Sequence, residues 1–292
     1  MPHSDPITSV VVLGAGTMGA GIAQVCALAG LRTLLSDVDE RALSQGIERI
    51  HRQIEDGVRR GKVAEAARDA ARAALAAAPD LEAAAGQADL VVEAAPERIE
   101  LKKDLFAKLS RLCPPEAILA TNTSSLSITA IASAATNPGR VIGLHFFNPP
   151  HIMKLLEVVV AGQTSDATLA AARQLAVRLG KTAIVVKDSP GFATSRLGLV
   201  LGLEAMRMLE QEVASAEDID RAMELGYGHP MGPLRVSDLV GLDVRLAIAE
   251  ILHHEVGETF RPPEILRRLV KDGKLGKKTG EGFHRWDDTP RT

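Results

Sequence analysis

His145 and Glu157 are the residue types that proton and hydride transfer require. His145 begins the segment His-Phe-Phe-Asn-Pro-Pro, and Glu157 follows it within the next predicted strand. Oxidation of an alcohol by hydride transfer needs a base for the hydroxyl proton, and histidine titrates near neutrality. A carboxylate on its second ring nitrogen would fix the tautomer and stabilise the imidazolium. The Asn-Pro-Pro turn lets the chain double back, so this pair is a candidate, although one histidine among eight is more often a packed or surface residue.

A candidate cofactor site lies near the N-terminus, where the pattern GAGTMG at residues 14–19 follows an apolar strand and opens a helix. In such a loop Gly14 permits a tight turn, Gly16 lets the backbone approach a pyrophosphate, and Gly19 lets the helix pack on the strand. The pyrophosphate would lie on the helix N-terminus. Asp37 ends the next strand, where a carboxylate accepts both ribose hydroxyls and repels the 2′-phosphate of NADP. We therefore expect NAD, the alternative being a structural glycine-rich turn.

Two charged residues follow another strand of the same region. Glu97 and Lys102 come after the apolar run LVVEAA, and ligands of such sheets bind beyond the carboxyl ends of the strands. Both are candidates for cofactor contacts. The alternative is that they are solvated charges on the surface of a helix.

The elements that must position these residues alternate in the first half of the chain. Short β-branched runs separated by helical stretches predict a parallel sheet with crossover helices. An Ala-rich stretch between residues 41 and 85 predicts a protruding helical pair, because no strand-like run interrupts it. The predicted strands are 7–13, 33–36, 90–93, 118–121, 141–144, 154–160 and 182–186.

The pattern changes at the segment Asp-Ser-Pro-Gly-Phe, residues 188–192, because proline and glycine end the last strand. Only helices are predicted after it, with a loop rich in glycine and proline at 226–233. We expect a Rossmann-type α/β domain over 1–187 and a smaller all-α domain over 188–292. The predicted helices of that second domain are 193–212, one beginning near 215, 238–256 and 263–272.

Composition excludes several classes of protein. The net charge is −3 without a long basic tract, which argues against nucleic-acid binding, and no apolar run is long enough to span a membrane. The N-terminus lacks the basic start and apolar run of a signal peptide. Cys26 and Cys113 do not have metal-ligand spacing, and no metal site is expected. A reducing cytoplasm fits this cysteine usage.

Taken in order, several motifs of this chain resemble those of the 3-hydroxyacyl-CoA dehydrogenases, and together they cover nearly the whole chain. The resemblance implies NAD-dependent oxidation of a short (S)-3-hydroxyacyl-CoA to the 3-oxoacyl-CoA, as in fatty-acid β-oxidation. It also implies that the helical domain closes the substrate cleft and forms a homodimer. The motifs are GAGTMG, ADLVVEA, TNTSSLSIT, GLHFFNPP with MKLLEV, DSPGF, GHPMGP with DLVGLD, and GKLGKKTGEGF.

The resemblance implies a role for each matched residue. His145 takes the hydroxyl proton, Glu157 pairs with His145, and Ser124 hydrogen-bonds the substrate oxygen. Asn148 helps to hold substrate and cofactor. The positions that match cofactor contacts are Gly14, Gly16, Thr17, Met18, Gly19, Asp37, Glu97, Lys102, Asn122, Ser124 and Lys278.

The chain departs from the family pattern after the 188–192 segment. The substrate-contacting asparagine of the family is Ser195 here, and the usual Asn-Glu-Ala reads Leu203-Glu-Ala. These changes leave the redox residues intact and put the substrate pocket in doubt.

Basic residues in the helical pair offer a second ligand site. Arg59, Arg60 and Lys62 could bind the phosphates of CoA, or they could form a solvated helix face. The substrate also stays open: a sugar acid or carnitine-like 3-hydroxy acid is the rival within the superfamily. A non-catalytic NAD-binding protein, like the crystallins related to this fold, is the rival outside it.

Overall fold

The computed structural model describes residues 7–286, so residues 1–6 of the first expected domain and 287–292 of the second lie outside the described part. The chain folds into two compact units, residues 1–188 and 189–292. The first unit is an α/β sandwich with a Rossmann-type sheet and the second consists of helices, which confirms the predicted fold class.

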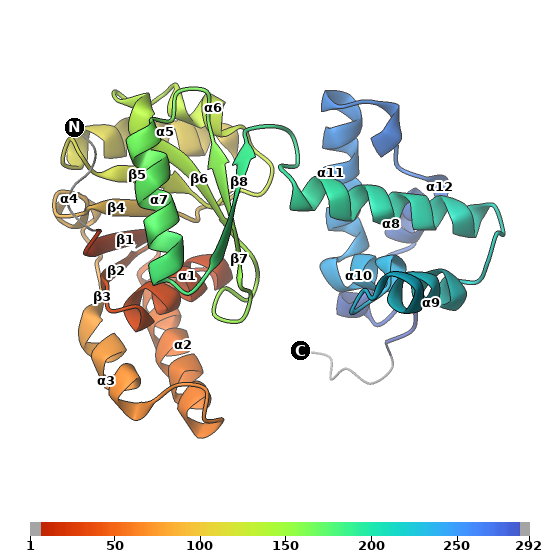
Figure 1. The fold of residues 1–292 in the computed structure, drawn as a ribbon, viewed down its shortest axis with the longest axis horizontal. Helices are drawn as coiled ribbons and strands as arrows, with labels where there is room; N and C mark the ends of the chain where they lie inside the picture. The colour runs from red at the N-terminus through yellow and green to blue at the C-terminus, as the bar shows by residue number, and fades with distance from the viewer. Residues whose placement is uncertain (1–6, 287–292) are drawn as a thin grey trace. The chain divides into compact units, whose positions relative to one another are not determined.

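One eight-stranded sheet forms the centre of the first unit, in the order β3-β2-β1-β4-β5-β6-β7-β8 (Figure 1). All neighbouring strands are parallel except β6 and β7, so the parallel sheet expected for the first half of the chain is confirmed and is followed by one antiparallel pair. A parallel pair needs a long crossover, and the short turn between β6 and β7 permits only the antiparallel arrangement. The strands are β1 (Ser9–Leu13), β2 (Arg32–Ser36), β3 (Leu75–Ala77), β4 (Leu90–Glu93), β5 (Ile118–Thr121), β6 (Val141–Phe146), β7 (Leu155–Val160) and β8 (Thr182–Lys187).

The expectation that residues 41–85 contain no strand is wrong. Helices α2 (Glu40–Arg59) and α3 (Glu65–Ala74) form the predicted pair and extend side by side away from the sheet (Figure 1). They are followed by β3, which pairs with β2 at the edge of the sheet. The sequence Leu-Ala-Ala of β3 has no β-branched residue, so its conformation comes from this pairing and not from intrinsic propensity.

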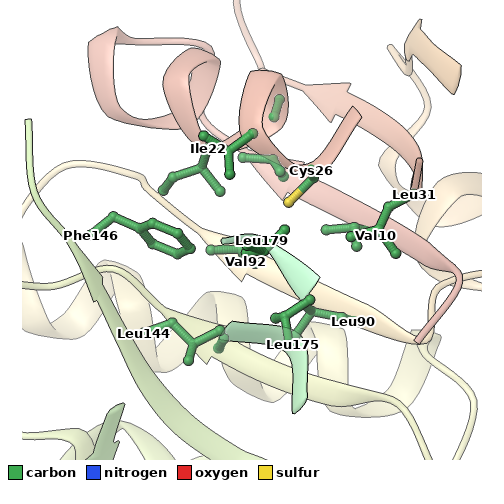
Figure 2. Close-up of a cluster of buried hydrophobic side chains, with 14 of the residues drawn as sticks. Val10, Ile22, Cys26, Leu31, Leu90, Val92, Leu144, Phe146, Leu175 and Leu179 are labelled. Atoms are coloured by element: carbon green, nitrogen blue, oxygen red, sulfur yellow. The ribbon is translucent and has the colours of Figure 1, made fainter. Parts of the chain in front are cut away.

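Helices cover both faces of the sheet, as its buried strands require. Helix α1 (Thr17–Leu28) and helix α7 (Asp166–Arg178) pack on one face, where Cys26 and Leu175 meet side chains of β1, β4 and β6 (Figure 2). Helix α5 (Ile99–Leu112) contacts β5, and helix α6 (Ile128–Ala132) contacts β6. The short α4 (Leu81–Ala85) and a 3₁₀ turn at Pro138–Arg140 complete this unit.

The second unit has one helix more than predicted. The expected helix over 238–256 is two helices, because Gly241 adopts φ +105° between them, a conformation that few residues other than glycine accept. The apolar core of this unit includes Leu199, Met206 and Leu252. Its elements are α8 (Thr194–Glu210), α9 (Ala216–Tyr227), α10 (Pro233–Val240), α11 (Leu242–Glu255), α12 (Glu264–Lys271) and 3₁₀ turns at Glu258–Phe260 and Lys277–Thr279. Within residues 7–286, no helix combines the length and apolarity needed to cross a membrane.

Candidate active site

The glycine loop joins β1 to α1 and has the geometry of a backbone cradle. Gly14 has φ +96°, and a Cβ there would lie 2.6 Å from the Ala94 carbonyl oxygen. A Cβ on Gly19 would collide with the carbonyl of Gly14. At Gly16 a Cβ would meet nothing within 4 Å. The loop is therefore closed on the sheet side at Gly14 and Gly19 and open at Gly16, where a pyrophosphate could approach.

The N-terminus of α1 adds the electrostatic part of this cradle. No side chain caps the helix, and its first turn, which contains Thr17 and Met18, has no acidic residue. Uncapped N–H groups and the helix dipole favour an anion at this position. The residues present therefore fit the diphosphate of a dinucleotide.

Asp37 lies beside this loop at the end of β2. Its Oδ2 accepts a hydrogen bond from the Ala15 amide at 2.6 Å, and its Oδ1 accepts one from the Asp39 amide at 3.0 Å. These contacts fix a half-buried carboxylate next to the cradle. An anchored acceptor here fits the ribose hydroxyls of NAD and opposes a 2′-phosphate.

His145 and Glu157 face each other across the antiparallel pair of strands. They are paired in the register of β6 and β7, and His145 Nδ1 lies 2.6 Å from Glu157 Oε2. Glu157 is fully buried and His145 is 7% exposed. The Phe147 ring lies 4.5 Å from the imidazole, centroid to centroid. A carboxylate on Nδ1 sets the tautomer in which Nε2 accepts a proton.

A pocket of about 360 Å³ brings most of the predicted redox residues together. It is formed by residues at or after the carboxyl ends of β1, β4, β5 and β6, the edge at which such sheets bind ligands. Its lining consists of Met18, Ala94, Ala95, Glu97, Lys102, Asn122, Ser124, His145, Phe146, Phe147 and Asn148.

Asn122 connects two of the strands that form the pocket. The Asn122 side-chain Oδ1 accepts a hydrogen bond from the Phe146 backbone amide at 2.9 Å. The Asn122 backbone amide donates a hydrogen bond to the Glu93 backbone carbonyl at 2.8 Å. The side chain therefore ties the end of β5 to the end of β6, beside His145.

Glu97 organises the loop that carries Ser124. Its Oε1 accepts hydrogen bonds from the Ser124 amide and the Ser125 hydroxyl, both at 3.1 Å, and from the hydroxyl of Thr123. Glu97 thus holds the polar loop after β5 in a fixed position relative to the pocket.

Lys102 is buried, so the interpretation of it as a solvated surface charge is wrong. It is 1% exposed, and its Nζ donates to Glu93 Oε1 at 2.6 Å and to the Ala95 carbonyl at 3.2 Å. Its Nζ also lies 3.4 Å from Glu97 Oε2. The cation lines the pocket and is held there by carboxylates.

Glu93 was missed by the sequence reasoning. Its carboxylate is fully buried and accepts from the Ala95 amide at 2.6 Å and the Thr121 hydroxyl at 2.7 Å, as well as from Lys102. A carboxylate that ends an apolar strand, with a lysine nine residues later, was the signal available. Such a buried pair is stable only when its remaining atoms are hydrogen-bonded, as they are here.

The predicted CoA-binding cations lie apart from this pocket. Arg59 ends α2 and forms an ion pair with Asp56, and Arg60 and Lys62 follow it with exposed side chains. None of the three lines the pocket.

Two further predicted residues belong to the helical unit. Ser195 is half-buried in the first turn of α8. Lys278 Nζ lies 2.6 Å from both carboxylate oxygens of Asp243, and this hydrogen bond lowers the pKa of Asp243. Among the described residues, no group of histidine, cysteine and acidic side chains could hold a metal ion.

Comparison with known proteins gives matches over both units. Residues 9–189 match the family model "3-hydroxyacyl-CoA dehydrogenase, NAD binding domain", and residues 191–286 match the C-terminal domain of the same family. The chain is 43% identical to the probable 3-hydroxybutyryl-CoA dehydrogenase of Bacillus subtilis, over 97% of this chain and 98% of the relative. It is also 43% identical to the 3-hydroxyadipyl-CoA dehydrogenase of Escherichia coli, over 96% of this chain and 59% of the relative.

A solved structure is similar over the same length. The (S)-3-hydroxybutyryl-CoA dehydrogenase of Ralstonia eutropha has a TM-score of 0.92 and 38% identity, covering 96% of this chain and 99% of that one.

Proposed function

The chain belongs to the 3-hydroxyacyl-CoA dehydrogenase family, and we propose that it oxidises the 3-hydroxyl of a short (S)-3-hydroxyacyl-CoA with NAD. The observation that carries this proposal is the buried contact between His145 and Glu157 at the NAD-binding unit's pocket. The names of the relatives support 3-hydroxybutyryl-CoA as the first substrate to test.

In the proposed reaction His145 acts as the general base. Its Nε2 accepts the proton of the 3-hydroxyl while Glu157 stabilises the imidazolium through Nδ1. NAD, when bound, would supply the acceptor for the hydride that leaves carbon 3. Ser124 and Asn148 position the substrate oxygen. The products are the 3-oxoacyl-CoA, NADH and a proton left on His145.

The cofactor site is proposed to extend from the glycine loop to the pocket. Gly14, Gly16, Thr17, Met18 and Gly19 receive the diphosphate, and Asp37 receives the adenosine ribose. The residues proposed at the nicotinamide end are Glu97, Lys102, Asn122 and Ser124. Lys278 is proposed as a further cofactor-contacting residue because of its position in the family motif.

The substrate site is proposed to include Ser195 in addition to Ser124 and Asn148. Arg59, Arg60 and Lys62 are proposed to bind the CoA phosphates, because they are exposed cations at one end of a helix. Of the three, Arg59 has an acidic partner in the described residues.

We propose a homodimer formed through the helical unit. Its described surface exposes large apolar side chains, among them Leu197 at 64%, Leu225 at 84% and Tyr227 at 78%. Exposed apolar side chains in such numbers are typical of interaction surfaces. We also propose a cytoplasmic location, because both cysteines are unpaired, as a reducing compartment allows.

A turnover assay with NAD tests the proposed function. The expected result is NADH formation with (S)-3-hydroxybutyryl-CoA and little with free 3-hydroxybutyrate. Faster turnover of free 3-hydroxybutyrate, of carnitine or of a sugar acid than of (S)-3-hydroxybutyryl-CoA would show that the substrate is not an acyl-CoA. NAD binding without turnover of any of them would favour a non-catalytic protein.

A further inference from the structure

The turn between β6 and β7 carries two residues of the pocket. It comprises residues 147–154, and both Phe147 and Asn148 line the pocket beside His145. The Phe147 ring contacts the imidazole, and Asn148 is proposed above to position the substrate oxygen. The tip of the turn is exposed, with Ile152 at 64%. Apolar packing of the tip therefore contributes little to the position of the turn.

Lys181 binds this turn through two backbone carbonyls. Its Nζ donates hydrogen bonds to the Pro150 carbonyl and, at 2.6 Å, to the Met153 carbonyl. The Pro150 ring packs against α1, since a Cβ added at Gly21 would lie 2.7 Å from Pro150 Cδ. The turn is thus held by the ammonium group of Lys181 and by a helix face that has no side chain at Gly21.

The backbone of Lys181 is itself fixed. Its amide donates to the Ala176 carbonyl in the last turn of α7, at 2.9 Å. The next amide, that of Thr182, donates to the Lys154 carbonyl at 2.8 Å, where β8 pairs with β7. The side chain therefore starts from a rigid position at the end of a strand and reaches a turn from an earlier part of the chain.

The charge of Lys181 is not balanced by an acidic side chain. Within residues 7–286 its hydrogen bonds go to carbonyl oxygens, and no carboxylate forms an ion pair with it. Burial lowers the pKa of Lys181, so this half-buried site disfavours the ammonium form. A cation that is unfavourable where it lies, and whose side-chain hydrogen bonds both go to one turn, indicates a role in holding that turn.

We propose that Lys181 is a positioning residue that holds Asn148 at the pocket by fixing the turn after β6. This proposal rests on the proposed function and adds a residue to the same site. The connection between the two residues is short, because Pro149 and Pro150 follow Asn148 directly and each proline ring fixes one backbone dihedral. Fixing the Pro150 carbonyl therefore restricts where Asn148 can lie.

Replacement of Lys181 tests the proposal. Lys181→Met keeps most of the length of the side chain and removes the donors. It should lower kcat with (S)-3-hydroxybutyryl-CoA by about tenfold or more, because a small displacement of a positioning group slows the reaction steeply. The Kd for NADH should change little, since Asp37 and the glycine loop do not belong to this turn. Lys181→Arg should recover most of kcat, because a guanidinium also donates several hydrogen bonds.

A double variant shows whether Lys181 acts through Asn148. Asn148→Ala should lower kcat, and Lys181→Met should lower it little further in that background, because the residue that it positions is already lost. Independent losses that multiply in the double variant would overturn the proposal. If Lys181→Met does not fold, Lys181→Gln carries the same test, since its side chain is shorter and uncharged.

A matched control separates this effect from a general loss of positive charge. Lys108 lies on α5 of the same unit and forms a surface ion pair with Glu82 at 3.0 Å. Lys108→Met should leave kcat unchanged. An equal fall of kcat in Lys108→Met and Lys181→Met would overturn the positioning role.

Hydrogen exchange distinguishes this proposal from the proposed function. The Ile152 and Met153 amides both donate to the Pro149 carbonyl at 3.0 Å. Without substrate or NAD they should exchange about tenfold faster in Lys181→Met than in the parent, because the turn opens more often. That result supports the hold of Lys181 on the turn even if the parent oxidises no acyl-CoA. Unchanged exchange, or an unchanged kcat in an enzyme that does oxidise (S)-3-hydroxybutyryl-CoA, would overturn the role of Lys181 and leave the proposed function intact.

Discussion

His145 and Glu157 occupy directly opposed positions on β6 and β7, with 2.6 Å between Nδ1 and Oε2. The contact is thus set by the backbone register of a sheet and not by flexible loops. Both side chains are buried, so the hydrogen bond is poorly screened by water. A base held in this way is oriented before any substrate arrives.

The first prediction concerns this pair. His145→Gln should lower kcat by roughly a hundredfold or more, the usual size of a lost general base, while NAD still binds. Glu157→Gln should lower kcat as well, because the ring loses the carboxylate that sets its tautomer. Steady-state kinetics and a fluorescence titration of NADH measure both effects. A His145→Gln enzyme as fast as the parent would exclude the mechanism.

The second prediction concerns Glu93, which holds Lys102 at the pocket. Glu93→Gln should raise the KM for NAD by about tenfold and lower the free energy of unfolding by about 3–5 kcal/mol, because the buried Lys102 loses the nearer of its two carboxylates. Cofactor kinetics and urea unfolding measure these two changes.

A double variant separates the two roles of Glu93. Combining Glu93→Gln with Lys102→Met removes both charges, so stability should largely recover while the KM for NAD stays high. Recovery of both quantities together would show that Glu93 affects the cofactor only through general stability.

The third prediction concerns the choice of cofactor. Asp37→Ser should reduce the preference for NAD over NADP in kcat/KM, because the ribose acceptor and the repulsion of the 2′-phosphate are both lost. Asp39→Ser is the matched control, since Asp39 caps α2 through the Arg41 and Ala42 amides and serine can also cap. A parent enzyme that used both cofactors equally would contradict this assignment.

The fourth prediction concerns CoA. Replacing Arg59, Arg60 and Lys62 by alanine should raise the KM for the acyl-CoA and weaken its salt dependence, with little change for NAD. Arg72→Ala is the control, because Arg72 lies on α3 of the same pair and is bound to Glu55. An unchanged KM for the acyl-CoA at low salt would show that the three residues are surface charges that do not bind CoA.

The fifth prediction concerns alkaline stability. Burial raises the pKa of the Cys26 thiol from 9.0 to about 12, so the folded state keeps a proton that the unfolded chain loses. The contribution to stability is complete below pH 9 and falls as the pH rises towards 12, by at most about 1.4 kcal/mol per pH unit.

Urea unfolding between pH 8 and 10.5 measures this slope. Cys26→Ala should be less stable than the parent at pH 8 and should show a flatter decline above pH 9. A parallel decline in both proteins would assign the alkaline loss to other groups.

Much of the α/β unit could be predicted from its sequence, because buried parallel strands are β-branched and glycine loops have fixed spacing. The strands at 90–93 and 118–121 were predicted with the bounds that the structure shows. Strand β3 could not be found in this way, since only its pairing with β2 makes Leu75–Ala77 extended. The end of one helix and the start of the next at Gly241 could not be predicted either, because a glycine with apolar neighbours is also compatible with one continuous helix.

The site was predicted in part. His145 and Glu157 followed from chemistry and a turn motif, but their contact depends on the register of β6 and β7, which no periodicity specifies. The burial of Lys102 depends on a carboxylate of another element, so the local pattern left a solvated surface charge open as the alternative to a cofactor contact. The spacing of Glu93 and Lys102 in the sequence was compatible with this pair but did not show that both side chains are buried.

The register of β6 and β7 also determines where insertions and deletions are compatible with the site. Leu144 and Phe146 contribute to the core on one face of the sheet, and His145 points to the other face. Losing or gaining one residue within either strand would exchange these faces, which would turn His145 into the apolar core and separate it from Glu157. Insertions in the turn between Pro150 and Lys154 keep the register intact and leave Phe147 and Asn148 at the pocket. Changes in the length of that part of the turn are therefore compatible with the site, whereas insertions or deletions within the two strands are not.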